Sequence, residues 1–280
     1  MAASRSAGER EQRRAAEGNA PSLRAVLATR PLGLFLDFDG TISELAPTPE
    51  DAVLSPRAGT LLEELASRCH LAIVSGRTLA VLRRKVGLPN LIYVGAHGLA
   101  TWIDGREERE AATAAYADLA RQAIAELASL RHLPGLLFEE KESGVALHFR
   151  LAEQPDAVRA EILRAVAGSP AAAQFELLEG IKMVELRPGG EGNKGAAVRR
   201  LAQRLGLGGL IYAGDDLTDL DAFAAVRDLR EQGLAGLSVA VRNGQASPAV
   251  AAAADRVVDG VQGVEALLEA ALQALTMPAA

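Results

Sequence analysis

Two aspartates spaced one residue apart, Asp37 and Asp39, are the residues of this chain best suited to chemistry. They follow the apolar run 34–36, and period-2 alternation along an extended backbone points both side chains to the same side. Gly40 and Thr41 then let the chain turn away. Burying paired carboxylates at a strand end is costly unless a cation or a reaction holds them there. The segment therefore predicts an aspartate that attacks phosphorus beside a second aspartate that acts as acid and base.

A second group of carboxylates, Asp215, Asp216 and Asp219, follows another apolar run at residues 210–213. Magnesium prefers oxygen ligands, keeps several waters and takes only one or two protein carboxylates directly. The two acidic groups together therefore predict a Mg²⁺ site, with Asp215 as a direct ligand.

The smallest ligand set that satisfies this preference combines the carboxylates of Asp37 and Asp215 with the backbone carbonyl of Asp39. Asp216 and Asp219 would then stand behind the ligands, where they could orient water molecules and a lysine. Acidic residues also cap helices, and this competing interpretation suits Asp219 well but Asp215 poorly.

Two further residues, Ser75 and Lys194, could hold a phosphoryl group. Ser75 ends the apolar run 71–74, so its hydroxyl could donate to a phosphoryl oxygen beside the first amides of a helix. An ordinary helix cap explains Ser75 equally well. Lys194 opens a predicted helix, where its charge opposes the helix dipole. Contact with a phosphate would explain that placement, although a solvated surface lysine is the simpler explanation when Lys194 is considered alone.

The periodicity of apolar residues predicts the elements that must position these side chains. From residue 33 to 94, and again from 194 onward, short buried strands alternate with amphipathic helices, as is typical of a doubly wound parallel sheet. The middle of the chain has the pattern of an inserted α+β module. We expect helices there at 111–130 and 156–166, with strands at 136–138, 145–149 and 175–178.

The predicted fold class is therefore α/β, a doubly wound parallel sheet of the Rossmann-like type with an inserted α+β domain. We expect the core domain at residues 25–106 and 184–280 and the inserted domain at 107–183. A cleft between them would be the natural ligand site. Residues 1–24 have few large apolar side chains and predict a mobile extension.

Composition limits the partners and the compartment. The net charge of −6 argues against nucleic acid or an anionic membrane as a main partner. Cys69 is the single cysteine of the 280 residues, so no intrachain disulfide can form and a reducing compartment is suitable. No apolar run approaches the roughly 20 residues that span a bilayer, and the N-terminus has no hydrophobic signal core. We therefore expect a cytoplasmic protein, whose oligomeric state the sequence leaves open.

The chain resembles the haloacid-dehalogenase-like phosphatases in four segments and in their order, those around Asp37, Ser75, Lys194 and Asp215. Finer details resemble the trehalose-6-phosphate phosphatases within that superfamily. The resemblance covers roughly residues 30–270. Beside the acidic motifs, it depends on the pieces at 95–98, 139–141, 146–150, 180–182, 184–188 and 214–219. The chain departs from the family pattern at Leu220, where glutamate is usual, and at Arg187, where lysine is common.

The resemblance implies Mg²⁺-dependent hydrolysis of trehalose 6-phosphate through an aspartyl-phosphate. Asp37 would be the nucleophile and Asp39 the general acid and then base, a role that needs a raised pKa. Ser75 and Lys194 would hold the transferring phosphoryl group. The inserted domain would be a mobile cap. The substrate contacts that the resemblance implies are Asp39, Gly40, Arg77, His97, Glu139, Lys141, His148, Lys182 and Glu185.

The residues of the inserted domain agree with this only in part. Alternation leaves His148 on a polar face of its strand, but Lys182 and Glu185 differ in parity and need a bulge or a strand end between them. A solvated outer face of the sheet is the competing explanation, and it is about as good for Glu139 and Lys141.

Two other functions stay open at this point. A related phosphatase could act on another sugar phosphate, such as sucrose phosphate or a glycosyl-3-phosphoglycerate. A non-catalytic sugar-phosphate sensor is the second possibility, but such a protein would be expected to have lost Asp37, Asp39 or Lys194, and the chain has all three.

Overall fold

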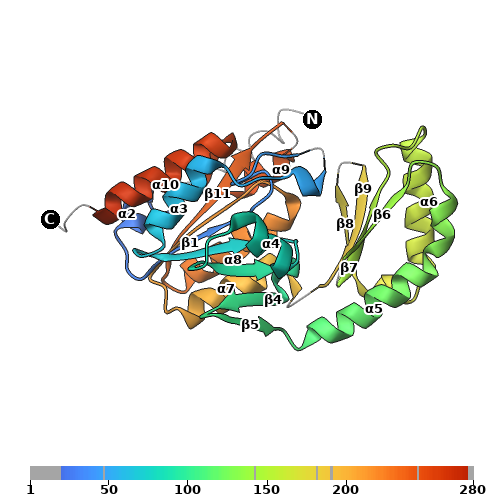
Figure 1. Ribbon diagram of the computed structural model, residues 1–280, viewed down its shortest axis with the longest axis horizontal. Coiled ribbons are helices and arrows are strands. Elements are labelled where there is room, and N and C mark those ends of the chain that lie inside the picture. The colour runs from blue at the N-terminus through green and yellow to red at the C-terminus, as the bar shows by residue number, and fades with distance from the viewer. Residues whose placement is uncertain are drawn as a thin grey trace, which may run out of the picture. The chain divides into compact units, whose positions relative to one another are not determined.

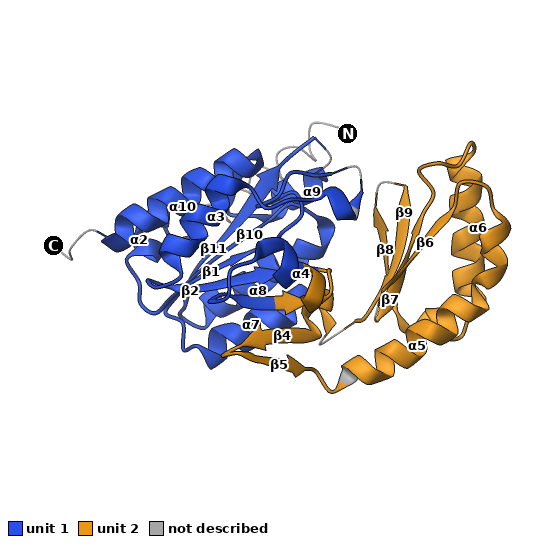
Figure 2. Ribbon diagram, in the orientation of Figure 1, with its two compact units in different colours: residues 1–75, 82–93, 194–280 blue, residues 76–81, 94–193 orange. Residues whose placement is uncertain are grey.

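The computed structural model describes residues 20–276 except 47, 142, 181, 190, 191 and 245, so most of the predicted extension at 1–24 lies outside the described residues. The chain forms two compact units (Figure 2). Unit 1 comprises residues 1–75, 82–93 and 194–280, and unit 2 comprises 76–81 and 94–193. The expected domain limits at 107 and 183 stay predictions.

The strands of unit 1 form the predicted doubly wound parallel sheet. Within an eight-stranded sheet, the order of these six strands is β12-β11-β10-β1-β2-β3, with β1 between β10 and β2. The chain leaves β1 toward β2 and later returns to its other side, which makes the adjoining ends of β1 and β10 a topological switch point. The strands are β1 (Leu32–Leu36), β2 (His70–Val74), β3 (Ile92–Gly95), β10 (Gly209–Gly214), β11 (Ala235–Arg242) and β12 (Arg256–Asp259).

Two groups of helices cover these strands (Figure 1). Helices α2, α3 and α10 pack together on one side, and α7 packs with α8 on the other. Helix α3 starts where Ser55 accepts a hydrogen bond from the amide of Ala58 and Pro56 occupies the first turn. The helices are α2 (Leu23–Leu27), α3 (Pro56–Leu65), α4 (Leu79–Val86), α7 (Lys194–Arg204), α8 (Leu220–Glu231), α9 (Pro248–Ala253) and α10 (Gly260–Thr276), with short 3₁₀ turns η1 (Pro49–Asp51) and η6 (Leu217–Asp219).

Unit 2 contains a four-stranded antiparallel sheet in the order β6-β7-β9-β8. Its core joins α5 and α6 to one face of that sheet, where alternate residues such as Val145, Leu147 and Val184 are buried. The elements are β4 (Ala100–Ile103), β5 (Arg106–Arg109), α5 (Ala112–Glu126), β6 (Leu137–Lys141), β7 (Gly144–His148), α6 (Pro155–Ala167), β8 (Glu176–Gly180) and β9 (Met183–Arg187), with 3₁₀ turns η2 (Ala96–Gly98), η3 (Ala128–His132) and η4 (Ala172–Gln174).

The face of this sheet opposite the helices carries the polar residues. In the ladder, Glu139 of β6 pairs with Ala146 of β7, which pairs in turn with Glu185 of β9. Lys182 lies in the turn before β9 with a φ of 54°, so the strand begins after it. The required break between Lys182 and Glu185 is therefore a strand end.

Among the described residues, no helix combines the length and the apolar character needed to cross a membrane.

Candidate active site

The ends of β1 and β10 bring two distant acidic segments together. The two strands pair in parallel from Leu32 with Gly209 to Leu36 with Ala213, and the amide of Asp37 extends the ladder by donating to the carbonyl of Ala213 at 2.9 Å. One carboxylate oxygen from each of three buried residues, Asp37, Asp215 and Asp219, lies within 4.8 Å of the others. Parallel strands place their carboxyl ends at one sheet edge, which is why residues so far apart in sequence meet there.

Lys194 is the cation of this cluster. It is the first residue of α7 and is buried, so the solvated-lysine explanation does not apply. Its Nζ lies 3.0 Å from Oδ1 of Asp37 and 2.7 Å from Oδ1 of Asp219. Although burial alone would lower the pKa of Lys194, the two carboxylates raise it well above its usual range. The lysine is therefore charged at any physiological pH.

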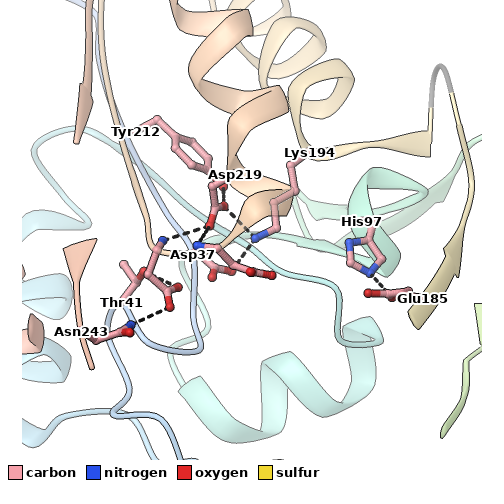
Figure 3. A network of polar contacts seen from close by, with 10 residues as sticks. Asp37, Thr41, His97, Glu185, Lys194, Tyr212, Asp219 and Asn243 are labelled. Carbon is pink, nitrogen blue, oxygen red and sulfur yellow. Dashed lines mark hydrogen bonds and ion pairs between the residues drawn. The ribbon is translucent and has the colours of Figure 1, made fainter. Parts of the chain in front are cut away.

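Asp219 uses both of its carboxylate oxygens to hold neighbouring groups (Figure 3). Oδ1 accepts from Lys194 and from the hydroxyl of Tyr212 at 2.6 Å. Oδ2 accepts from the amides of Asp215 and Asp216, each at 3.0 Å. These four contacts match the acceptor capacity of a carboxylate, so Asp219 suits the role of orienting Lys194 and the 215–216 backbone better than that of a metal ligand. It also caps η6 together with Asp216, whose own side chain is exposed.

Asp215 is held from two sides by residues that the sequence analysis did not assign to the site. Its Oδ2 accepts from Nδ2 of Asn243 at 2.7 Å, and its Oδ1 accepts from the hydroxyl of Thr41 at 3.4 Å. Burial and the charge of Asp219 raise the pKa of Asp215 to about 7. Gly40 has a φ of 72°, and a Cβ there would lie 2.1 Å from Oδ2 of Asp215. Only glycine lets this turn pass so close to the carboxylate.

The charge of the cluster suits a divalent cation. Burial raises the pKa of Asp37 well above its ordinary value, Lys194 opposes that rise, and the carboxylates of Asp219, Asp215 and Asp39 add to it. Three buried carboxylates thus share one buried lysine within the cluster. Oxygen donors with excess negative charge are what Mg²⁺ binds. The residues present therefore fit the ion, with Asp37 and Asp215 as the carboxylates that Asp219 leaves available.

The remaining predicted residues of unit 1 lie at the ends of strands of the same sheet. Asp39 is half-buried and forms an isolated bridge with Ser43 in the turn after β1. Ser75 directly follows β2 and is buried. Since β2 is the parallel neighbour of β1, Ser75 belongs to the same edge of the sheet as Asp37.

Tyr212 is a further buried residue whose role the sequence analysis did not predict. It stands in the middle of the apolar run of β10 and packs edge-on against Phe223, with ring centroids 6.0 Å apart. A tyrosine in a fully buried strand needs a partner for its hydroxyl, and this was the available signal. The signal for Asn243 was weaker and consisted only of its position directly after β11, at a strand end.

Replacing Tyr212 by phenylalanine is expected to lower kcat for phosphate release by about 10- to 100-fold, because a hydrogen bond to a charged acceptor contributes about 1.5–3 kcal/mol. The KM should change little, since the tyrosine acts through Asp219 and Lys194. Steady-state kinetics checks both. The matched control is Tyr93→Phe, an equally buried tyrosine whose hydroxyl donates to the carbonyl of Leu88. Equal losses in the two variants would contradict a positioning role for Tyr212.

In unit 2, the polar face of the sheet holds two linked acid–base groups. Glu185 is buried and contacts both His97, at 3.2 Å between Oε1 and Nε2, and Lys141. Glu139 lies 2.8 Å from Nε2 of His148. The hydrogen bond from His148 lowers the pKa of Glu139. Although burial opposes it, Lys141 and His97 hold the pKa of Glu185 well below its usual range. This face presents ionised acceptors beside fixed donors, an arrangement that suits hydroxyl groups.

Two other predicted contacts in unit 2 differ from these five. Lys182 is exposed in its turn, and the structure does not place it in either of the linked groups. Arg77 is half-buried, and its carbonyl accepts from the amide of Ala96 at 2.8 Å.

A family model and several known proteins match most of this chain. The model of the family described as trehalose-phosphatase matches residues 35–257. A curated trehalose-phosphate phosphatase of Mycobacterium tuberculosis is 39% identical over 207 residues, which are 71% of this chain and 52% of that protein. The chain spans about half the length of the curated trehalose-phosphate phosphatases it matches.

Solved structures agree in fold. The C-terminal domain of a Candida albicans trehalose-6-phosphate phosphatase superposes with a TM-score of 0.75 at 19% identity, covering 91% of this chain and 98% of that one. A trehalose-6-phosphate phosphatase related protein superposes with a TM-score of 0.67 at 24% identity, covering 86% and 97%. At this identity the likeness concerns the architecture.

Proposed function

Because this chain belongs to the trehalose-phosphatase family, we propose that it hydrolyses trehalose 6-phosphate to trehalose and phosphate, with Mg²⁺ as cofactor. The observation that best supports an enzyme, and not a binding protein, is the contact of Lys194 with Asp37 inside a buried acidic cluster. A binding protein would gain nothing from so much buried charge, because uncompensated carboxylates destabilise the fold.

In the first step, a carboxylate oxygen of Asp37 attacks phosphorus and the bond between phosphorus and the sugar oxygen breaks. The electron pair stays on the leaving oxygen, and Asp39 gives that oxygen a proton. The product is an aspartyl-phosphate on Asp37 together with free trehalose. Lys194, already fixed by Asp219, is in position to stabilise negative charge on the phosphoryl oxygens.

In the second step, Asp39 takes a proton from water as the water oxygen attacks phosphorus. The bond between phosphorus and Asp37 breaks, its electron pair returns to the carboxylate, and inorganic phosphate leaves. Ser75 would donate to a phosphoryl oxygen in both steps. When bound by Asp37, Asp215 and the Asp39 carbonyl, Mg²⁺ would supply positive charge that offsets the charge of the phosphoryl group.

We assign recognition of the sugar to unit 2. Glu185 and Glu139 are ionised acceptors, while Lys141 and His148 are donors on the same sheet face. A sugar ring offers vicinal hydroxyls that both donate and accept, so it can satisfy all four groups. Arg77, Gly40 and the exposed Lys182 stay predicted contacts.

The experiment that tests this function measures phosphate release from a panel of sugar phosphates with and without Mg²⁺. We expect turnover of trehalose 6-phosphate, abolished by chelation and restored by Mg²⁺. Turnover confined to sucrose phosphate or to a glycosyl-3-phosphoglycerate would replace the substrate but keep the mechanism. Tight binding of trehalose 6-phosphate with no release from any ester would instead support a sensor.

The affinity for Mg²⁺ is expected to rise with pH up to about 7. Burial raises the pKa of Asp215 to about 7, so at lower pH the ion must displace a proton from this ligand. The apparent Kd should therefore increase about tenfold for each pH unit below that value and level off above it. Calorimetric titration in two buffers of different ionisation enthalpy measures the affinity and the protons released. An affinity that stays constant from about pH 6 to about pH 8 would remove Asp215 from the ligand set.

A further inference from the structure

The turn after β3 has a backbone that L-residues seldom adopt. Ala96, His97 and Gly98 have φ values of 49°, 56° and 114° in succession. For residues with a Cβ the left-handed region is sterically unfavourable, and such strain persists only where the surroundings impose it. Ala96 and His97 are two consecutive non-glycine residues in this conformation. Neighbouring groups must therefore hold the turn, and the turn must place a side chain that matters.

The segment that follows Ser75 fixes the turn. The amide of Ala96 donates to the carbonyl of Arg77 at 2.8 Å. Gly76 lies directly against the imidazole of His97, because a Cβ on Gly76 would be 2.5 Å from Cε1 and 2.6 Å from Nε2. No side chain at position 76 can coexist with His97 in this place.

The strained turn aims His97 at Glu185. The imidazole is 6% exposed, and its Nε2 lies 3.2 Å from Oε1 of Glu185, as Figure 3 shows. Lys141 contacts the same oxygen. Since an ionised carboxylate only accepts, Nε2 of His97 must carry the hydrogen of this contact. Both donors converge on Oε1, so two contacts to one oxygen fix the Glu185 carboxylate.

We propose that His97 is a positioning residue for sugar recognition, which orients the Glu185 carboxylate and can occupy its place only because Gly76 has no side chain. This role differs from the direct substrate contact that the family resemblance implies for His97. The inference rests on the proposed function, because it needs a sugar phosphate as the substrate whose hydroxyl Glu185 accepts.

The test is a double-mutant cycle on Gly76→Ala and His97→Ala. The quantity measured is kcat/KM for trehalose 6-phosphate divided by kcat/KM for p-nitrophenyl phosphate, which lacks the sugar. We expect His97→Ala to lower this ratio by about tenfold or more, the effect of losing one hydrogen bond that orients a charged group. His97→Gln should recover part of it, because its amide can donate to Glu185.

Gly76→Ala should lower the ratio in the same direction with His97 still present, because the new methyl group displaces the ring. In the His97→Ala background the same substitution should add little, since the steric conflict has been removed. The matched control is His132→Ala, which replaces an exposed histidine of η3. Circular dichroism of each variant checks that it folds.

Three outcomes would overturn the proposal: equal losses on both substrates, additive effects of the two substitutions, or no recovery by glutamine in a folded protein. A failure of the proposed function looks different, because wild-type protein would then hydrolyse p-nitrophenyl phosphate but not trehalose 6-phosphate. In that case the same cycle is run on whichever sugar phosphate the panel identifies, and the three outcomes keep their meaning.

Discussion

Asp37→Asn is expected to abolish phosphate release, with a loss of about 10⁴-fold or more. The amide is a poor nucleophile, so no aspartyl-phosphate can form on it, although its size and shape match the carboxylate. Steady-state assays with trehalose 6-phosphate and with p-nitrophenyl phosphate measure the loss, which should be equally severe for both esters. Retained activity on either ester would remove Asp37 from the mechanism.

The matched comparison is Asp39→Asn, two residues further on. This variant loses the proton donor but keeps the nucleophile, so turnover of trehalose 6-phosphate should fall by roughly 10²–10⁴-fold. Formation of the aspartyl-phosphate from p-nitrophenyl phosphate should suffer less, because p-nitrophenolate leaves without being protonated. A burst of p-nitrophenol followed by slow turnover would show it. Near-normal turnover of the sugar phosphate would contradict the role of Asp39 as acid and base.

Lys194→Met is expected to lower kcat by at least about 10³-fold and to destabilise the fold. The methionine has a similar length but no charge, which leaves Asp37 and Asp219 buried without their cation. Removing one partner of a buried ion pair costs about 3–5 kcal/mol. Thermal unfolding measures the stability, and phosphate release measures the rate.

Two further variants separate the stability from the rate. Adding Asp219→Asn to Lys194→Met removes one uncompensated charge, so stability should partly return while activity does not. Lys85→Met is the matched control, because the Nζ of Lys85 contacts only the backbone carbonyls of Glu50 and Ala52 among the hydrogen bonds described for it. If the double variant regained activity together with stability, the charge of Lys194 would not be needed for the reaction.

The sequence by itself determined which residues stand at the strand ends of unit 1. Asp37 and Asp215 each follow a run of apolar residues that is fully buried in the structure. Such runs identify parallel strands because both faces of the sheet are covered. Since all parallel strands end at one edge, placing the acids after the strands was enough to bring them near one another.

The pattern of apolar residues predicts strands less well where a strand is short or exposed. The hairpin of β4 and β5 was not predicted, because Arg106–Arg109 is charged and exposed along its whole length and shows no alternation. Strand β9 lies outside the strands expected at 136–138, 145–149 and 175–178, and the sequence pattern assigns its residues from 184 onward to the core domain. Its first residue could not be fixed from pattern, because Lys182 ends the preceding turn with a left-handed backbone.

Only the tertiary structure decided how the acids are held. Tyr212 reaches Asp219 across a few residues, but Thr41 and Asn243 reach Asp215 from positions 174 and 28 residues away. Those contacts depend on the order of the strands, which hydrophobic periodicity does not encode. The contact between Gly76 and His97 could not be predicted from periodicity either. It requires a left-handed backbone in the turn, and the residue types Ala96 and His97 do not indicate one. Periodicity records which face of an element is buried, whereas the partner that buries it is set by how the elements assemble.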